Sequence, residues 1–555
     1  MHCNIQPSKL DMKNLFKGRN KVQRNESRTP LMKENNNNVE DGYNQADDTL
    51  ARYTSNTQRE QEFTYQELAE FLSVDLPDTF EDGCWCKVQP GQHNLNLNII
   101  RLIQKSVLKH FPKPPSHLDE NLPQHLLHVQ GTVLHELMRL GPQLKRMGWM
   151  GYLIDCYHHQ TFEHLHILLQ NATTAKNTFV LMNWVQRVYL SKELLGHPDL
   201  QEIDPTGKVD VMFFKEWDAK AKDKLLENVQ KSVEGSLKII LQNEMAQDQC
   251  DCEETYIGLS LDIIQCIDAM HNEAKKISSE LPDSVKEVCF QELLMFLKRY
   301  VAEQTEALGE KAKMDKPETI HFLRTLKTCK ELKQYVQTEG AGIKTSLLND
   351  MVRLLENMEA STFNLLIDIV TDIAESHLKK YFKSHNKRFL LCAAVQKNFP
   401  KLQYGLDEQK RVMDEAYKLI VRIYIKHLVR SSQSKLKKRW SPNVGQTVIE
   451  DAELLHSIMS DLAPGVQQWN LTLLKIAEIL ECNSVDTLKI ECAAMQNHCL
   501  TMSEDMELLP AVLRWKGVSN WKLNEVLYAL PPDLQPRPDP DRQPSRTRSW
   551  FCCFN

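Results

Sequence analysis

The densest group of side chains that could do chemistry is a run of histidines between His117 and His166. A zinc-protease helix carries two histidines four residues apart, with a glutamate beside the first. His135-Glu136 begins that pattern, but Arg139 occupies the position of the second histidine. We therefore expect these histidines to be satisfied by hydrogen bonds or solvated. A metal-dependent hydrolase built in a helical bundle is therefore only a remote alternative function.

The other motifs with catalytic or metal-binding character are incomplete. Gly340 to Thr345 resembles a phosphate-binding loop, but Ile343 stands between the glycine and the lysine, and a helical pattern precedes it. We predict a turn between two helices there. Cys84-x-Cys86 and Cys250-x-Cys252 have no CxxC partner at zinc-finger spacing. The sequence therefore predicts a protein that is not an enzyme and that needs no metal or other cofactor.

Three segments of the sequence are predicted to bind membranes or partners, and the first is a basic amino-terminal arm. Leu10, Leu15 and Phe16 alternate there with lysines and arginines. Such a segment binds an anionic leaflet with about 1 kcal/mol per basic residue near the surface; the alternative is a solvated tail. Ser27, three residues after Arg24, is a position where phosphorylation would weaken this attraction. The predicted membrane-binding residues are Lys9, Lys13, Lys17, Arg19, Lys21 and Arg24.

The second surface is a basic link that follows an amphipathic helical pattern. A charge run at such a place is often only the solvated face between two helices. As a binding site it would fit an acidic protein surface or lipid headgroups. The predicted partner-binding residues are Lys426, Arg430, Lys435, Lys437, Lys438 and Arg439.

The third surface is the carboxy-terminal sequence around Cys552 and Cys553. Cys552 stands fourth from the end, as in a prenylation box, but Asn555 is not a usual final residue and Cys553 is not aliphatic. Two cysteines beside aromatic residues and arginines are alternatively a palmitoylation site, and lasting attachment needs two signals. We predict lipidation of Cys552 or Cys553; the alternative is a free tail.

The elements that carry these surfaces are predicted to be helices. The 555 residues exceed what one core usually serves, and the 19 glycines are too few for a turn-rich β-architecture. A net charge of −6 argues against bulk nucleic-acid binding. No apolar run approaches the roughly 20 residues that span a bilayer, and residues 1–20 have no secretory pattern. We therefore expect a cytoplasmic protein with reduced cysteines, of which most lie in apolar helical runs.

Apolar stripes at three- and four-residue steps locate several helices. The clearest runs from Asp350 to Phe382. Another is predicted to begin with the capping box Ser284-Val-Lys-Glu287, and a third near Asp407. A fourth is predicted to have Ser441 as N-cap and Pro442 in its first turn. Lys208 to Phe214 is the one short stretch with a strand-like pattern.

These elements predict an all-α protein, an elongated rod of stacked antiparallel helical bundles. Composition shifts and Pro/Gly breaks divide the chain into five parts. Residues 1–60 form a disordered arm, basic and then acidic. Helical bundles follow over residues 61–250, 251–402 and 403–530, and residues 531–555 form a flexible tail that ends in the cysteine pair.

Two stretches resemble the Sec6 family, which comprises the exocyst subunit Sec6, its Sec6-like relatives and M-Sec. In the first, an apolar run from Phe179 leads through Trp184 and Tyr189 to His197-Pro198-Asp-Leu200. In the second, Tyr417 to Leu428 is followed by the basic link Lys435–Arg439 and the acidic helix start at Ile449 to Leu455. The likeness extends more loosely over residues 63–530. The short length of the chain and its amino-terminal arm resemble the M-Sec branch most. The Cys552-Cys553 end departs from that branch.

The resemblance implies a rod of helical bundles without an active site. It implies vesicle tethering in exocytosis at the plasma membrane, with exocyst subunits, SNARE proteins and a small GTPase as partners. The alternative within the same fold is a small-GTPase-linked regulator of actin-rich membrane protrusions that acts outside the full exocyst. Together with the basic surfaces it predicts a cytoplasmic protein, peripheral at the plasma membrane, that also binds anionic lipids but no nucleic acid.

Overall fold

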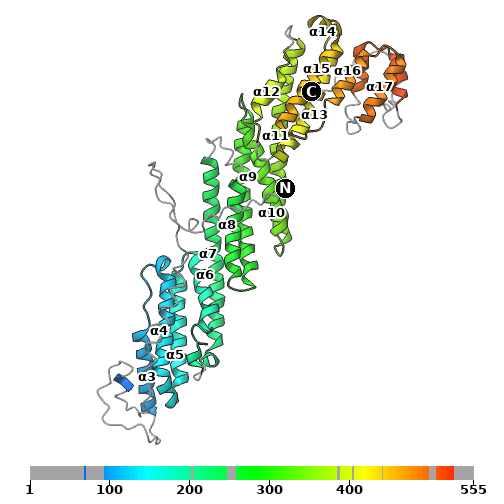
Figure 1. The fold of residues 1–555 in the computed structure, drawn as a ribbon. Coiled ribbons are helices and arrows are strands. Elements are labelled where there is room, and N and C mark those ends of the chain that lie inside the picture. Colours follow the sequence, from blue (N-terminus) through cyan, green and yellow to red (C-terminus); the bar gives the residue numbers. More distant parts are fainter. Residues whose placement is uncertain are drawn as a thin grey trace, which may run out of the picture. The chain divides into compact units, whose positions relative to one another are not determined.

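The computed structural model describes residues 68–70, 93–201, 205–246, 258–383, 388–402, 406–440, 442–498 and 508–530. Within these ranges every regular element is a helix (Figure 1). The prediction of an all-α protein is confirmed for this part of the chain. The described residues form two compact units, each with its own buried core.

The first unit contains the helices from α3 to α7 and parts of later ones. Helix α4 packs against α5 and α6, and α3 packs against α5. Tyr189, at the end of a π-helix that continues α6, is buried in this core. The elements are α3 (His93–His110), α4 (Leu118–Arg146), α5 (Met150–Asn171), α6 (Ala175–Trp184), π-helix η2 (Val185–Tyr189), 3₁₀-helices η3 (Pro198–Leu200) and η4 (Thr206–Lys208), and α7 (Val211–Ala246).

Two stretches from later in the sequence complete the first unit: Ile263–Phe296 and Gly342–Leu347. Helices α8 (Gly258–Lys275) and α9 (Leu281–Ala312) therefore contribute residues to both units. Because the units are assembled from non-contiguous segments, the contiguous bundles 61–250, 251–402 and 403–530 and their stacking into a rod stay a prediction.

The second unit holds the carboxy-terminal helices and the basic link. Helix α15 packs against α12, α13 and α16, α17 packs against α16 and α19, and α18 packs against α13, α16 and α19. Its elements are α10 (Thr319–Glu339), most of α11 (Thr345–Lys383), α12 (Leu391–Asn398), α13 (Leu406–Arg430), α14 (Gln433–Arg439), α15 (Val444–Leu462), α16 (Leu471–Glu481), α17 (Val485–His498), α18 (Leu509–Lys516) and α19 (Asn520–Tyr528).

Apolar periodicity located the long helices well. Helix α11 contains the whole predicted stretch from Asp350 to Phe382, and Met351, Leu355 and Met358 of its stripe are buried. Gly340 to Thr345 is the predicted turn between α10 and α11, and its Gly342 has a positive φ of 86°. A residue with a side chain would be strained in that backbone conformation.

Two predicted helix starts were wrong by a few residues. Helix α9 begins at Leu281, three residues before Ser284, because Leu281 and Val285 are buried and Pro282 is compatible with a first helical turn. Helix α15 begins at Val444, so Pro442 lies outside it. Its N-cap is Asn443, whose side chain accepts a hydrogen bond from the Gln446 backbone at 3.2 Å.

The strand-like stretch from Lys208 to Phe214 is helical in the structure. It contains the end of η4 and the first turn of α7. The Asp210 carboxylate accepts a hydrogen bond from the Met212 backbone at 2.8 Å, which satisfies a free N–H group at the start of α7.

The described cysteines behave as the sequence predicted. Cys266, Cys289, Cys392 and Cys492 are free thiols buried between helices. Burial raises the pKa of each of these thiols, so they remain protonated, poorly reactive packing groups. Within the described residues, no helix has both the length and the apolar character required to cross a membrane.

Candidate functional site

The basic link of the sequence becomes a short amphipathic helix in the structure. Ser431 and Ser432 separate the end of α13 from α14. Leu436 in α14 and Trp440 directly after it are both buried. Their four-residue spacing puts them on the same helical face, so the lysines between them point away from the core.

Aromatic stacking holds this helix against the end of α11. The Trp440 ring stacks on Tyr381, with ring centroids 4.9 Å apart and planes at 29°, and it also packs on Phe382 at 4.9 Å. The Arg439 guanidinium donates a hydrogen bond to the Phe382 carbonyl at 3.3 Å. Helix α14 is therefore fixed by packing, although it has only 7 residues.

Beneath Trp440 lies a buried carboxylate. The hydroxyls of Tyr381 and Tyr424 donate hydrogen bonds to one oxygen of Asp451, at 2.8 and 2.7 Å. Burial raises the pKa of Asp451 to about 7, although these hydrogen bonds favour the ionised form. The group of this site whose pKa lies near neutrality is therefore Asp451, which is buried below α14 and is not part of the exposed surface.

We call the six predicted basic residues of this segment the α14 patch: Lys426, Arg430, Lys435, Lys437, Lys438 and Arg439. Arg430, Lys435, Lys437 and Lys438 are exposed, whereas Lys426 and Arg439 are half-buried. The structure thus brings five of them to one helix end and one short helix, with Lys426 a turn earlier.

The exposed charges of the α14 patch are not neutralised by acidic neighbours. Among the described residues, Arg430, Lys435, Lys437 and Lys438 form no ion pair. Lysines on other helices commonly do: Lys231 pairs with Glu227 at 2.5 Å and Lys489 with Glu525 at 2.6 Å. An uncompensated cluster of like charge creates a local positive potential that attracts an acidic partner.

Helix α18 extends the patch with residues that sequence reasoning missed. Lys516 lies close enough to Lys437 for their charges to interact, and burial together with this repulsion lowers the pKa of Lys516. The Lys516 ammonium donates to the Leu480 carbonyl at 2.6 Å, and the Trp515 indole donates to the Ser431 carbonyl. The last turn of α18 is rich in basic residues, a sequence signal, but its place beside α14 depends on the tertiary fold.

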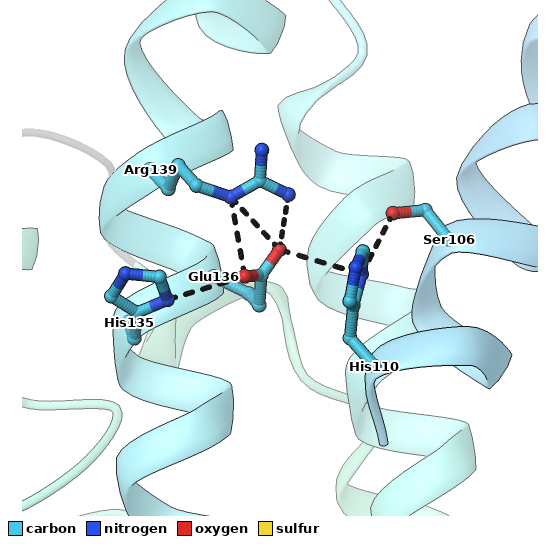
Figure 2. Close-up of polar contacts among 5 residues, drawn as sticks. All are labelled: Ser106, His110, His135, Glu136 and Arg139. Carbon is cyan, nitrogen blue, oxygen red and sulfur yellow. Dashed lines mark hydrogen bonds and ion pairs between the residues drawn. The ribbon is translucent and has the colours of Figure 1, made fainter. Parts of the chain in front are cut away.

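A second polar cluster surrounds Glu136 in the first unit (Figure 2). Glu136 is buried, and its carboxylate accepts hydrogen bonds from the Arg139 guanidinium on Oε1 at 3.2 Å and on Oε2 at 3.1 and 2.5 Å. His135 Nδ1 lies 3.2 Å from Oε1 of Glu136, and His110 Nδ1 lies 3.9 Å from Oε2. The carboxylate is therefore compensated by a bidentate arginine, as a structural ion pair would be.

The same cluster contains a serine, a histidine and a glutamate, but not in the geometry of a catalytic triad. Ser106 Oγ is 3.4 Å from His110 Nδ1, which is also the nitrogen that faces Glu136 (Figure 2). A triad needs the serine and the carboxylate on opposite ring nitrogens. Ser106 is also fully buried. The arrangement supports packing between α3 and α4 and not nucleophilic catalysis.

Three other histidines of this region, His125, His158 and His164, are buried and hydrogen-bonded within the core. His125 and His164 approach each other with ring nitrogens 2.6 Å apart, and burial lowers the pKa of both. His158 bonds to the Tyr189 hydroxyl at 2.8 Å and to the Asp210 carbonyl at 3.1 Å. The described residues contain no group of three or more metal-ligating side chains placed to hold an ion.

Two other groups of predicted site residues lie outside the described part of the chain. They are the amino-terminal lysines and arginines, Lys9, Lys13, Lys17, Arg19, Lys21 and Arg24, and the terminal cysteines, Cys552 and Cys553. Cys84, Cys86, Cys250 and Cys252 lie outside it as well. Their roles stay predictions.

Comparisons with known proteins agree with the fold and with the resemblance seen in the sequence. The family model of the exocyst complex component Sec6 matches residues 97–517. Mouse tumor necrosis factor alpha-induced protein 2 is 20% identical over 352 residues, which are 61% of this chain and 50% of that protein. The match thus spans about half the length of this relative. The crystal structure of M-Sec superposes with a TM-score of 0.56 at 18% identity, covering 81% of each chain, and shows the fold alone.

Proposed function

Because the chain belongs to the Sec6 family of exocyst complex components, we propose that it is a non-enzymatic tethering scaffold in exocytosis. It binds exocyst subunits and SNARE proteins and works in the cytoplasm, peripherally at the plasma membrane. The observation that carries this proposal is the family match over residues 97–517, which covers most of the helices of both units.

The α14 patch is the described surface best suited to hold such a partner. Its exposed cations form no ion pair among the described residues, and Leu436 and Trp440 fix the helix that presents them. A rigid cationic surface binds an acidic protein surface with less loss of side-chain and backbone entropy than a flexible tail does. Charge complementarity of this kind adds mainly to association rate and specificity.

Affinity purification of the full chain from cells tests the scaffold and the patch together. The variant K435Q/K437Q/K438Q removes the three exposed lysines of α14. The matched control K220Q/K224Q/K231Q removes three lysines of α7 that form surface ion pairs. We expect exocyst subunits or SNARE proteins with the wild type and the control, and much less of them with the α14 variant. Equal recovery with all three proteins would remove the patch from the binding site.

A second candidate function is regulation of actin-rich membrane protrusions through a small GTPase, outside the full exocyst. The fold shared with M-Sec and the unpaired cations of the α14 patch favour this function. It predicts that immobilised small GTPases retain the chain more strongly in the GTP state than in the GDP state. K435Q/K437Q/K438Q should reduce this retention while far-UV circular dichroism stays unchanged. Retention that does not depend on the nucleotide would argue against this candidate.

In this proposal, the two ends of the sequence attach the protein to the membrane. The basic residues Lys9 to Arg24 supply electrostatic attraction to anionic lipids, and acylation of Cys552 or Cys553 supplies the second signal that lasting attachment needs. Hydroxylamine-sensitive acyl exchange on the protein from cells tests the second signal. The double variant C552S/C553S should abolish the exchange at the carboxy-terminal peptide, and an unlabelled wild-type peptide would exclude thioester acylation there.

A further inference from the structure

The link between α13 and α14 places two serine hydroxyls at the surface of the α14 patch. Ser432 and Ser434 are exposed, and their oxygens lie 3.1 Å apart. Ser432 precedes α14, but its side chain makes no capping hydrogen bond to the helix. Ser431 is different, because it is half-buried and its hydroxyl donates to the His427 carbonyl at 2.8 Å. Ser432 and Ser434 therefore have hydroxyls available to a modifying enzyme.

Exposed cations flank both serines in the sequence. Arg430 lies two residues before Ser432, and Lys435 directly follows Ser434. Lys437 and Lys438 stand three and four residues after Ser434, so the helix brings them to the same face. Basic residues on both sides of an exposed serine are what basophilic serine kinases recognise, since their substrate grooves are acidic.

We propose that Ser434, together with Ser432, is a phosphorylation site of a basophilic serine kinase and that the modification switches off the α14 patch. This proposal rests on the proposed function of that patch. The co-substrate is a nucleoside triphosphate: Oγ forms a bond to the γ-phosphorus, the bond to the β-phosphate bridge oxygen breaks, and the hydroxyl proton passes to the kinase base. The nucleoside diphosphate leaves, and no redox change occurs.

The charge balance explains why one phosphate would suffice. A phosphoserine adds about two negative charges at neutral pH. It would sit among four exposed positive charges, Arg430, Lys435, Lys437 and Lys438. Modification therefore cancels much of the attraction to an acidic partner.

In vitro phosphorylation tests the site independently of any natural partner. The full chain is incubated with the catalytic domain of protein kinase C and Mg-ATP, and the phosphopeptides are mapped by mass spectrometry. We expect phosphate on Ser434 or Ser432 in the wild type, and none on this peptide in S432A/S434A or with a kinase that prefers acidic sequences. A wild-type peptide 431–439 that stays unmodified while other serines react overturns the proposal, whatever the fate of the proposed function.

Retention on polyglutamate beads tests the consequence. We expect phosphorylation to lower the affinity of the wild type about thirtyfold, as the cancellation of two surface charges would. S432A/S434A treated with the same kinase keeps its affinity and so reports any effect of phosphates elsewhere, and K435Q/K437Q/K438Q gives the lower limit. Phosphorylated and unmodified wild type with equal affinity would overturn the switch. A normal response here combined with no exocyst proteins in the cell purification would instead reject the proposed function.

Discussion

Replacing Asp451 by asparagine should change how the stability of the second unit depends on pH. Asparagine keeps a side-chain oxygen that can accept both tyrosine hydroxyls, but it cannot ionise. In the wild type, burial raises the pKa of Asp451 from 3.8 to about 7. The folded state therefore holds a proton between those pH values that the unfolded chain has released. The stability linked to this proton is complete below about pH 4 and is lost as the pH rises through about 7.

The expected size follows from the same two pKa values. One pKa unit corresponds to about 1.4 kcal/mol. Between pH 5.5 and pH 8 the Asp451 proton accounts for about 2 kcal/mol of unfolding free energy in the wild type. D451N should lack this loss, so it gains about 2 kcal/mol relative to the wild type over this range. Other titrating groups are common to both proteins and cancel in the difference.

Urea unfolding followed by tryptophan fluorescence measures this difference, because Trp440 stacks on Tyr381, whose hydroxyl donates to Asp451. Wild type and D451N are compared at pH 5.5 and pH 8. The two midpoints should move apart as the pH rises, with D451N the more stable protein at pH 8. Parallel pH dependence of the two proteins would refute the assignment of a buried, protonatable carboxylate at this place.

Three further predictions test other parts of the molecule. Trp440→Ala should lower the free energy of unfolding by about 3–5 kcal/mol and raise hydrogen exchange in residues 433–440, because it removes the ring that holds α14. The control Trp521→Ala, at a 65% exposed position, should lower the free energy of unfolding by less than about 0.5 kcal/mol. The free energy of unfolding of the first unit should fall as the pH falls from 6.5 to about 4, because burial lowers the pKa of His164 to about 4 and the unfolded chain takes up the proton first. In urea unfolding, His164→Leu should lose less of this free energy over the same pH range than the wild type, and an equal loss would contradict the prediction. Phosphatidylserine vesicles should bind the full chain less as salt rises and should bind it weakly after deletion of residues 1–33 in a flotation assay; salt-independent binding would count against an electrostatic arm.

Periodicity predicted the helices well because their apolar faces repeat along the sequence. Met351, Leu355 and Met358 of α11 belong to such a repeat, and all three are buried. Helix starts were less predictable, because several polar residues near Ser284 and Ser441 could cap a helix and the packing of Leu281 or the cap by Asn443 decided between them. The local sequence therefore contains several possible N-cap residues, and tertiary packing determines which of them begins the helix.

The exposed lysines of the candidate site could be predicted from the sequence, whereas the buried residues below them could not. A cluster of lysines can be recognised from sequence because exposed charges need no partner. The pairing of Asp451 with Tyr381 joins residues 70 positions apart, which only the fold brings together. One signal was present, since Asp451 lies among Val448, Ala452 and Leu455 on the apolar face of its helix. A carboxylate on such a face usually has a buried partner.

Zero-length cross-linking tests the central claim most directly. A carbodiimide joins lysine amines to carboxylates that are already in contact, so it reports which acidic surface the α14 patch binds. Applied to complexes of the full chain purified from cells, it should couple Lys435, Lys437 or Lys438 to aspartates or glutamates of an exocyst subunit or a SNARE protein. Complexes in which those partners are present but cross-link only elsewhere would contradict the site, and the absence of such partners would contradict the tethering function itself.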